Sequence, residues 1–141
     1  MKTKCILFIF YCWIAFISIS ACQSESEIKR AQFFSNGKSI YTAKCENCHG
    51  KQGEGLGQLY PSLTDSTFLQ RNRAKLPCII KHGTQQEIMI HGKKFDTPMP
   101  SNGQLTDQEI AYVLTYIGNT FGNELGLVST EEVQKDLSSC K

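Results

Sequence analysis

The sequence has little excess of charge, with a formal net charge of +2. Its 141 residues include 15 lysines and arginines against 13 aspartates and glutamates. Two of the lysines, Lys2 and Lys4, fall in a leader that we expect to be removed, which leaves 13 side chains of each sign. A nucleic-acid-binding protein usually presents a basic face, so this balance argues against that class of function.

Long apolar runs are scarce as well, and no internal repeat is present. Hydrophobic residues make up 40% of the chain and charged residues 20%, which are ordinary values for a folded soluble protein. These values exclude a disordered tail protein, a collagen-like fibre and a multi-span membrane protein. The length indicates a single domain. The unusual feature is the seven cysteines, whose roles have to be assigned before a fold is predicted.

Residues 1–21 have the three parts of a secretory signal peptide: a positive start, an apolar stretch and small residues before Cys22. The apolar stretch, from Ile6 to Ile19, is about 14 residues long, shorter than the ~20 residues that a membrane-spanning helix needs. Cys5 and Cys12 lie inside this leader and need no further role. The pattern predicts export from the cytoplasm.

The end of the leader, Ile19-Ser20-Ala21-Cys22, resembles the lipobox of bacterial lipoproteins. In that family the leader is cut before the cysteine and the cysteine thiol is acylated, so the resemblance implies that Cys22 is a lipidated first residue. Several acyl chains on one residue would hold the protein stably at a membrane, since each buried methylene contributes ~0.8 kcal/mol. An ordinary cleaved signal peptide, or a retained anchor helix, is the alternative.

Residues 22–35 are polar and charged, and they predict a tether between the anchor and the folded domain. Residues 36–141 then form the domain itself. A core of about 105 residues is marginal without additional stabilisation, and a large apolar cofactor would supply it.

Cys45-Glu46-Asn47-Cys48-His49 is a C-x-x-C-H motif, the attachment signature of c-type haem. Side chains three and four positions apart share one face of a helical turn, so Cys45, Cys48 and His49 are able to point the same way. Two thiols then add to the two vinyl groups of one porphyrin, and the adjacent imidazole reaches the iron as its proximal ligand. The motif predicts one haem c, with its iron, per chain.

Two other chemistries use paired cysteines. A dithiol redox motif of the thioredoxin kind needs a βαβ context, whereas the flanks here are helix-like before the motif and glycine-rich after it. A zinc site could use Cys45, Cys48, Cys78 and His82 as a Cys3His set. Export favours haem, because bacterial proteins with covalent haem mature outside the cytoplasm and a free dithiol there would tend to oxidise.

An electron carrier usually holds its iron from both faces, and four side chains are candidates for the second ligand: Met89, Met99, His82 and His91. Met99 lies in Thr97-Pro98-Met99-Pro100, where the prolines fix the backbone and exclude helix and central strand. A rigid extended loop is suited to hold a soft sulfur against iron, so we predict Met99 as the ligand.

The other three candidates have simpler explanations. Met89 alternates with apolar neighbours, and we expect it to pack in a short strand. His82 precedes a glycine and is expected at a helix C-terminus, and His91 is expected to be solvated in a hairpin turn. Ligation by methionine and histidine raises the reduction potential relative to two histidines. It also leaves no open coordination site, which argues against ligand binding and catalysis.

These pieces together resemble a class I, mono-haem cytochrome c. Matching segments run from about Gly37 to Asn123, and weaker similarity reaches Leu137. Gly37 and Tyr41 match the glycine and the aromatic residue of the family where its first and last helices cross. Phe121 departs from the family, in which many members have tryptophan, and we expect modest repacking there.

The resemblance also implies ligand roles. In the family a proline-bearing stretch lies along the proximal side of the haem, and the proline carbonyl accepts a hydrogen bond from the haem histidine. Pro61, in Pro61-Ser62-Leu63, is the matching position, and Met99-Pro100 matches the distal ligand loop. The cofactor-binding residues implied in this way are Cys45, Cys48, His49, Pro61 and Met99.

Helix start signals mark the C-terminal third of the chain. Thr106 and Glu109 form a capping box, and a stripe of apolar residues follows at helical spacing. Ser129, with Glu132 three residues later, predicts another helix over about residues 130–138. The apolar stripe is made of Ile110, Val113, Leu114, Ile117 and Phe121.

The middle of the chain predicts two short helices and a hairpin. Asp65 or Ser66 begins a helix that runs to about Asn72. Pro77 suits the first turn of a second helix, which ends before Gly83. Residues 87–95 predict a hairpin that turns at a His-Gly pair.

Cys78 and Cys140 are the two cysteines that these roles leave over, and an even number of thiols in an oxidising compartment favours pairing. A disulfide between them would close a loop of about 62 residues and stabilise the fold by ~4 kcal/mol in the chain-entropy model. Two separate thiols, with Cys78 buried in a helix and Cys140 at a frayed end, are the alternative.

We therefore expect an all-α, class I cytochrome c fold, with three to five helices around one covalent haem and a small β-hairpin. The expected function is one-electron transfer in the bacterial periplasm or cell envelope by a lipid-anchored protein that is not an enzyme by itself. Expected partners are redox proteins of a respiratory or dehydrogenase chain, which dock transiently through a small interface. A haem-based sensor or gas-binding protein, or a dedicated electron-transfer subunit of a dehydrogenase or reductase, is the alternative.

Overall fold

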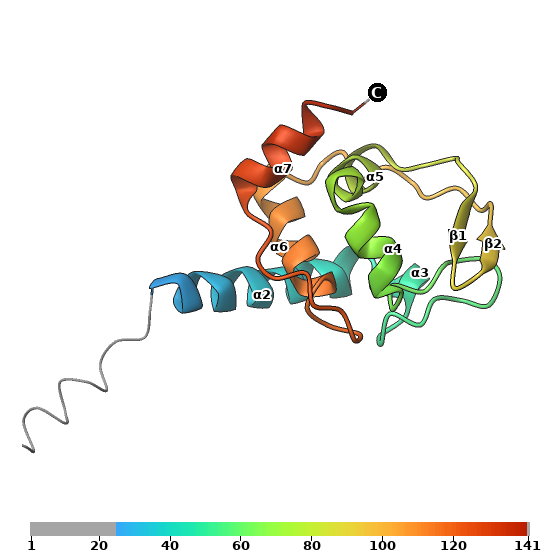
Figure 1. The fold of residues 1–141 in the computed structure, drawn as a ribbon, viewed down its shortest axis with the longest axis horizontal. Helices are drawn as coiled ribbons and strands as arrows, with labels where there is room; N and C mark the ends of the chain where they lie inside the picture. The colour runs from blue at the N-terminus through green and yellow to red at the C-terminus, as the bar shows by residue number, and fades with distance from the viewer. Residues whose placement is uncertain (1–24, 141) are drawn as a thin grey trace, which may run out of the picture.

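The computed structural model describes residues 25–140 of the chain. The predicted signal peptide, residues 1–21, and the predicted lipidation site, Cys22, lie outside the described residues. In chain order the elements are α2 (Glu25–Lys44), α3 (Glu46–His49), α4 (Ser66–Arg71), the 3-10 turn η1 (Arg73–Lys75), α5 (Leu76–His82), β1 (Ile88–Ile90), β2 (Lys93–Phe95), α6 (Asp107–Ile117) and α7 (Thr130–Leu137) (Figure 1).

The helical class predicted from the sequence is confirmed, and so is the hairpin. The strands β1 and β2 are antiparallel, with Ile90 paired to Lys93 beside the turn. The described residues form six α-helices, where at most five were expected, because the C-x-x-C-H turn is a separate helix, α3. No helix within residues 25–140 is both long and apolar enough to span a bilayer.

The helix α2 begins ahead of the predicted domain boundary. The prediction of a tether over residues 22–35 is wrong for residues 25–35, which form the first half of α2. Phe33 is only 6% exposed, and its ring meets the ring of Tyr112 edge-on, with centroids 4.7 Å apart. The polar composition predicted a solvated segment, but one buried aromatic among good helix formers extends the helix. Only the first turns of α2 project beyond the other helices (Figure 1).

The helices α2 and α6 cross at close range and form the centre of the core. Gly37 allows this approach, because a Cβ at that position would lie 2.0 Å from the backbone oxygen of Tyr112. The predicted capping box starts α6: the Glu109 N–H donates to Thr106 Oγ1 at 3.2 Å, and the Thr106 N–H donates to Glu109 Oε2 at 2.8 Å. The buried residues of α6 are Ile110, Ala111, Val113, Leu114, Thr115, Tyr116 and Ile117.

The predicted boundaries of the middle helices are confirmed, but one prediction on the hairpin is wrong. Asp65 begins α4 by accepting a hydrogen bond from the Phe68 N–H at 2.9 Å, and Pro77 lies in the first turn of α5. Met89 was expected to pack, yet it is 54% exposed, whereas its neighbour Ile90 is 3% exposed. Side chains alternate between the two faces of a strand, and in β1 the face of Met89 is the outer one.

The C-terminal helix α7 follows its predicted start signal. Ser129 Oγ accepts a hydrogen bond from the Glu132 N–H at 3.1 Å. Val133 is fully buried, because α7 packs against α6 and α5. The region beyond α6 is therefore part of the same core.

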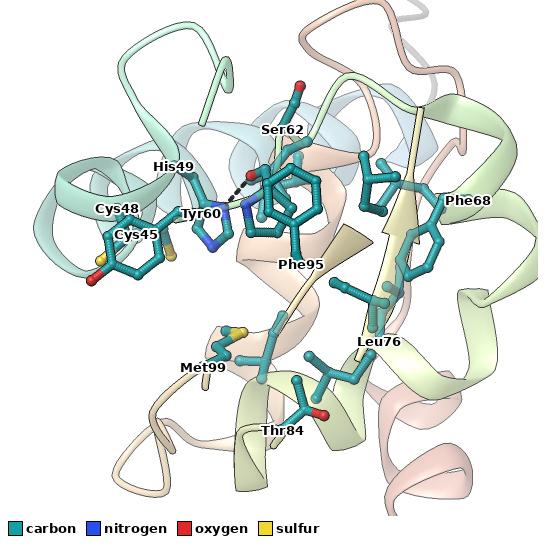
Figure 2. A pocket seen from close by; sticks show the side chains of 18 of the residues that line it. Cys45, Cys48, His49, Tyr60, Ser62, Phe68, Leu76, Thr84, Phe95 and Met99 are labelled. Carbon is teal, nitrogen blue, oxygen red and sulfur yellow. Dashed lines mark hydrogen bonds between the residues drawn. The ribbon is translucent and has the colours of Figure 1, made fainter. Parts of the chain in front are cut away.

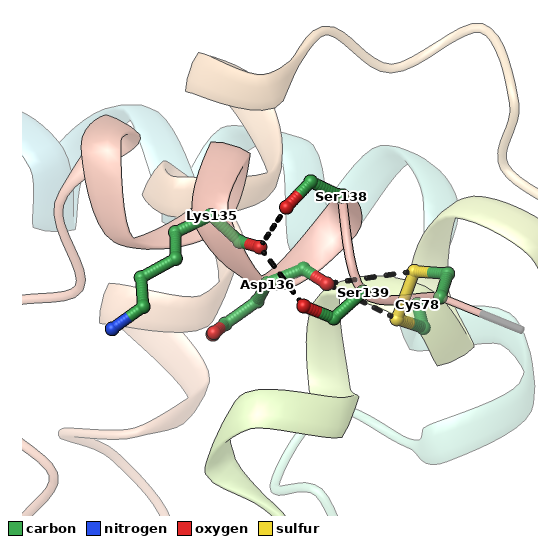
Figure 3. The surroundings of a disulfide bond; sticks show 6 residues. Cys78, Lys135, Asp136, Ser138 and Ser139 are labelled. Carbon is green, nitrogen blue, oxygen red and sulfur yellow. Dashed lines mark hydrogen bonds between the residues drawn. A yellow bond between two sulfur atoms is a disulfide. The ribbon is translucent and has the colours of Figure 1, made fainter.

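Two side-chain connections fasten this C-terminal region. A disulfide joins Cys78 of α5 to Cys140, and its sulfurs lie 3.7 and 3.8 Å from the backbone oxygen of Asp136 (Figure 3). The guanidinium of Arg73 donates to both oxygens of Glu132, at 2.5 and 3.0 Å. Because Arg73 lies in η1, the turn directly before α5, both connections tie the end of the chain to the α5 region.

Candidate functional site

An apolar pocket opens between α3, the loop after it, the hairpin and the segment around Met99 (Figure 2). Its empty space, open mouth included, is about 1180 Å³, and most of the side chains around it are apolar. The pocket therefore suits a large apolar ligand. Its apolar walls come from α4, α5, both strands and α6, and comprise Phe68, Leu69, Leu76, Ile79, Ile80, Ile88, Ile90, Phe95, Leu114 and Ile117.

The C-x-x-C-H motif lines one side of this pocket. Backbone N–H groups of Cys48 and His49 donate to the Cys45 oxygen at 3.1 and 2.9 Å, which winds the segment into one turn and brings all three side chains to the pocket. Both thiols are free and half-buried. Burial raises the pKa of the Cys45 thiol to about 11, and the neighbouring Cys48 adds to this effect. Cys45 is therefore a neutral thiol at pH 7.

The His49 imidazole is held in one tautomer by the backbone of Pro61. His49 Nδ1 lies 2.9 Å from the Pro61 oxygen (Figure 2). A carbonyl oxygen only accepts, so Nδ1 carries the proton and the lone pair of Nε2 is left for another partner. Burial lowers the pKa of His49, although the bond to Pro61 acts in the opposite direction. The ring is therefore neutral at pH 7, as a metal ligand must be.

Tyr41 of α2 anchors the end of the motif from behind. Its hydroxyl donates to the Gly50 oxygen at 2.5 Å, directly after His49 in the chain. Burial raises the pKa of Tyr41 well above its usual range, so the hydroxyl keeps its proton. Phe121 packs its ring against Tyr41 with centroids 5.4 Å apart, and it fills this position in the core without tryptophan.

Met99 lines the pocket from a separate loop, and Figure 2 shows its sulfur across the pocket from the His49 ring. The backbone of Met99 exchanges two hydrogen bonds with Thr84, at 3.0 and 2.8 Å. The Ser101 hydroxyl donates to the Lys81 oxygen at 2.7 Å, and the Asn102 N–H donates to the Ile80 oxygen at 3.0 Å. The loop is thereby fixed to the C-terminal end of α5.

The three rival ligands do not line the pocket. His82 and Met89 are exposed. His91 is exposed as well, and its Nε2 lies 3.1 Å from Thr64 Oγ1. Of the four candidates, only Met99 faces the same cavity as His49.

The two rival chemistries for the cysteines find no support in the described residues. The zinc set needs Cys78, which is bonded to Cys140. Residues 25–140 contain no cluster of three histidine, cysteine or acidic side chains that could hold a metal ion. The strands of this part of the chain form an antiparallel pair, not the βαβ unit of a thioredoxin.

Sequence reasoning missed most of the pocket wall and the residues that place the Met99 loop. Leu76, Ile79 and Ile80 of α5 face the pocket, and their helical spacing was a signal that could have identified them. The pairing of Thr84 with Met99 joins two distant segments, so no local pattern could have identified it.

The residues present fit a covalent haem. A haem c needs two thiols for its vinyl groups, a nitrogen donor beside them and an apolar cavity for the macrocycle. Cys45, Cys48 and His49 supply the first three groups from one turn, and the apolar walls supply the fourth. Met99 adds a thioether on the far side of the pocket (Figure 2).

Comparison with known proteins gives one family. The model of the family described as Cytochrome c matches residues 34–121 of the chain. Two relatives named cytochrome c-552, both from Thermus thermophilus, are 33% identical over 92 residues. The matches cover 62% of this chain, 70% of one relative and 62% of the other.

A longer relative matches with similar identity. The fructose dehydrogenase cytochrome subunit of Gluconobacter japonicus is 32% identical over 108 residues. The match covers 71% of this chain but only 21% of that subunit. The chain therefore corresponds to about a fifth of the larger protein.

Proposed function

The chain belongs to the class I, mono-haem cytochrome c family, whose cofactor is covalently bound haem c, and we propose that it carries single electrons with His49 and Met99 as the axial ligands. The observation that carries this proposal is the arrangement of the pocket, with Cys45, Cys48 and His49 on one wall and Met99 across from them (Figure 2). When bound, haem supplies an iron that alternates between ferrous and ferric states.

The proximal side supports the proposal through the orientation of His49. Its Nδ1 donates to the Pro61 oxygen at 2.9 Å, so Nε2 faces the pocket with a free lone pair. An acceptor behind a ligating histidine fixes the plane of the ring and increases its basicity. Pro61 therefore orients the ligand before haem is attached.

The distal side supports it through the rigidity of the Met99 loop. Backbone bonds to Thr84 hold Met99, so this loop would hold the sulfur at one position and would keep the reorganisation that accompanies electron transfer small. A thioether opposite an imidazole raises the reduction potential relative to two imidazoles. With His49 and Met99 both holding the iron, no coordination site would be left open for a substrate or a gas, so the proposed role of the chain by itself is that of an electron carrier and not of an enzyme or a gas sensor.

The proposed partners are redox proteins of a respiratory or dehydrogenase chain. Electron carriers dock transiently, through interfaces below ~1,200 Å², and the open mouth of the pocket is where such a partner would come near the haem edge. The family supports redox partners in general.

We place the protein in the bacterial periplasm or cell envelope. The support is in the sequence: residues 1–21 have the pattern of a signal peptide and Cys22 ends a lipobox-like segment. An acyl anchor at Cys22 would keep the carrier on the surface of a membrane near its partners.

A second candidate function is a dedicated electron-transfer subunit of a dehydrogenase. The likeness to the fructose dehydrogenase cytochrome subunit favours it. In that case the carrier would serve one enzyme in place of a diffusing pool of partners. Co-purification of a dehydrogenase with the membrane-extracted protein would distinguish this function from that of a general carrier.

The proposal is tested on the protein matured in a bacterium that attaches c-type haem. A pyridine haemochrome assay and the intact mass report covalent haem, and we expect one haem per chain. A colourless product of unmodified mass would contradict the proposal. Ligation is read from the weak far-red sulfur-to-iron band of the ferric protein and from the absence of carbon monoxide binding by the ferrous protein.

Two methionine variants identify the axial sulfur. Met99→Leu is expected to lose the sulfur-to-iron band and to bind carbon monoxide. Met89→Leu is the matched control, because Met89 is 54% exposed on the hairpin, and it should behave like the wild-type protein. Carbon monoxide binding by the wild-type protein would instead favour a sensor.

A further inference from the structure

Asn123 joins the end of α6 to the segment on the proximal side of the pocket. It is 4% exposed, and its Nδ2 donates to the Leu63 oxygen at 2.8 Å and to the Ile117 oxygen at 3.0 Å. Both acceptors are carbonyl oxygens, so the nitrogen of the amide must face them. The Oδ1 atom is buried and makes no hydrogen bond within the described residues. The side chain therefore acts only as a double donor.

Leu63 is held from both sides of its backbone. Its N–H donates to the Gly53 oxygen at 2.7 Å, and its carbonyl accepts from Asn123. The Ser62 hydroxyl also donates to the Gly53 oxygen, at 3.0 Å. This short segment is therefore pinned between the loop after α3 and the end of α6.

The pinned segment carries the acceptor of the haem histidine. The Pro61 oxygen, which accepts from His49 Nδ1 at 2.9 Å, lies only one residue before Ser62. The Pro61 oxygen and the Ser62 N–H belong to one planar peptide unit, and only the backbone torsions of Ser62 and Leu63 separate this unit from the carbonyl that Asn123 holds. Because the Ser62 hydroxyl and the Leu63 N–H are both bonded to the Gly53 oxygen, these torsions have little freedom to absorb a shift of Leu63. Asn123 is connected to the His49 bond in this way although it does not line the pocket.

We propose that Asn123 is a positioning residue for the haem histidine: its amide fixes Leu63 and so holds the Pro61 oxygen against His49 Nδ1. The inference rests on the proposed role of His49 as an iron ligand. Groups that hold the outer hydrogen bond of a ligating histidine set its orientation and donor strength. Asn123 therefore takes part in setting the reduction potential from outside the pocket.

Asn119 provides a matched control at the same end of α6. Its Nδ2 also donates to two backbone oxygens, those of Thr115 and Gly126, at 2.7 and 2.8 Å. These bonds fasten the C-terminal segment and do not reach the Pro61 segment. Substitution of Asn119 therefore shows how much the removal of an asparagine from this end of α6 changes the protein when the proposed link to His49 is intact.

The experiment compares Asn123→Leu with Asn119→Leu in the haem-loaded protein. Exchange of the His49 Nδ1 proton is followed by NMR in the ferrous state, and the midpoint potential is measured in parallel. In Asn123→Leu we expect exchange up to about tenfold faster, the factor that corresponds to losing the net value of one hydrogen bond. We also expect a more positive potential, because a weaker hydrogen bond makes His49 a poorer donor to ferric iron. Asn119→Leu should leave both quantities at the wild-type value.

A milder substitution keeps the test possible if Asn123→Leu folds poorly. Asn123→Ser keeps one hydroxyl donor and should lie between the wild-type protein and the leucine variant in both quantities. Unchanged exchange and potential in a folded Asn123 variant would overturn the inference, and so would equal changes in Asn119→Leu. The haem spectrum of the wild-type protein tests the proposed function separately, so a normal spectrum with unchanged exchange counts against the inference alone.

Discussion

Thr84 and Met99 exchange two backbone hydrogen bonds, with the Thr84 N–H donating to the Met99 oxygen at 3.0 Å and the Met99 N–H donating back at 2.8 Å. This bridge sits beside Gly83, which has φ +73° and ends α5. A Cβ on Gly83 would lie 2.3 Å from the Met99 oxygen. The methionine loop and the end of α5 are therefore built as one unit.

Substitution of Gly83 should disturb Met99, the proposed axial ligand. In Gly83→Ala we expect a loss of about 2 kcal/mol or more in the free energy of unfolding, since the backbone conformation of Gly83, φ +73° and ψ −173°, is almost confined to glycine and costs other residues ~1–3 kcal/mol. The clash with the Met99 oxygen adds to this cost. We also expect the ferrous protein to begin binding carbon monoxide. Gly92→Ala is the control, because Gly92 also has positive φ, +71°, but a Cβ there would meet nothing within 4 Å. Equal carbon monoxide binding in both variants would contradict the role of the Met99 contact.

Removal of the disulfide should destabilise the protein strongly. The bond links residues separated by 62 positions, and a loop of that length is worth ~4 kcal/mol in the chain-entropy model. We expect Cys78→Ser/Cys140→Ser to lower the free energy of unfolding by about that amount in urea titrations, with haem still attached at Cys45 and Cys48. Reduction of the wild-type protein with a dithiol should give the same loss. A loss below about 1 kcal/mol would show that α7 is held mainly by its other contacts.

Replacement of Arg73 by lysine should destabilise the protein. Its guanidinium donates to Glu132 and also to the backbone oxygens of Leu125 and Leu127, at 2.5 and 3.1 Å. A lysine has a single nitrogen and does not reproduce this fork. We expect Arg73→Lys to lower the free energy of unfolding by about 2 kcal/mol, as measured by urea titration. A lysine variant as stable as the wild-type protein would contradict this account.

The partner of Arg73 should make stability depend on pH in the acid range. The hydrogen bond from Arg73 lowers the pKa of Glu132 below its ordinary value of 4.5. A lowered pKa in the folded state means that this stabilisation is complete above about pH 4.5 and is lost as the pH falls through the folded value. The free energy of unfolding should therefore fall on acidification, and the slope should be smaller in Glu132→Gln. An unchanged slope in that variant would assign the acid sensitivity to other carboxyl groups.

Phe33 should stabilise the fold as other buried core residues do, although it lies in the segment predicted as a tether. It is 6% exposed and packs on Tyr112, and loss of a buried phenylalanine costs about 3–5 kcal/mol. We expect Phe33→Ala to lower the melting temperature clearly, while Gln32→Ala, at an exposed position of the same helix, changes little. Equal melting temperatures of Phe33→Ala and Gln32→Ala would mean that the first half of α2 does not contribute to the stability of the fold.

The features predicted from the sequence are those with a local cause. The capping box of Thr106 and Glu109, the cap at Asp65 and the proline at the start of α5 each involve residues a few positions apart. Local hydrogen bonds determine such features, so these features do not depend on contacts with distant parts of the chain.

The errors came where a distant contact decided the outcome. The polar composition predicted a tether over residues 22–35. Residues 25–35 are instead helical, and the Phe33 ring packs against the ring of Tyr112 on α6. The apolar neighbours of Met89 predicted that it packs in the core, but the sequence does not specify which face of a short strand is covered. For Phe33 the deciding partner, Tyr112, lies far away in the chain. For Met89 the outcome depends on which face of β1 is turned to the pocket, and that is the face of Ile88 and Ile90.

By itself the sequence determined the attachment chemistry, because Cys45, Cys48 and His49 lie within one helical turn and their convergence needs only local hydrogen bonds. It also narrowed the second ligand to a few side chains. Only the tertiary structure decided which of these faces the pocket, and only it joined Asn123 to Leu63 and Arg73 to Glu132. The physical reason is that these contacts depend on the packing of whole helices against one another, which no spacing along the chain specifies.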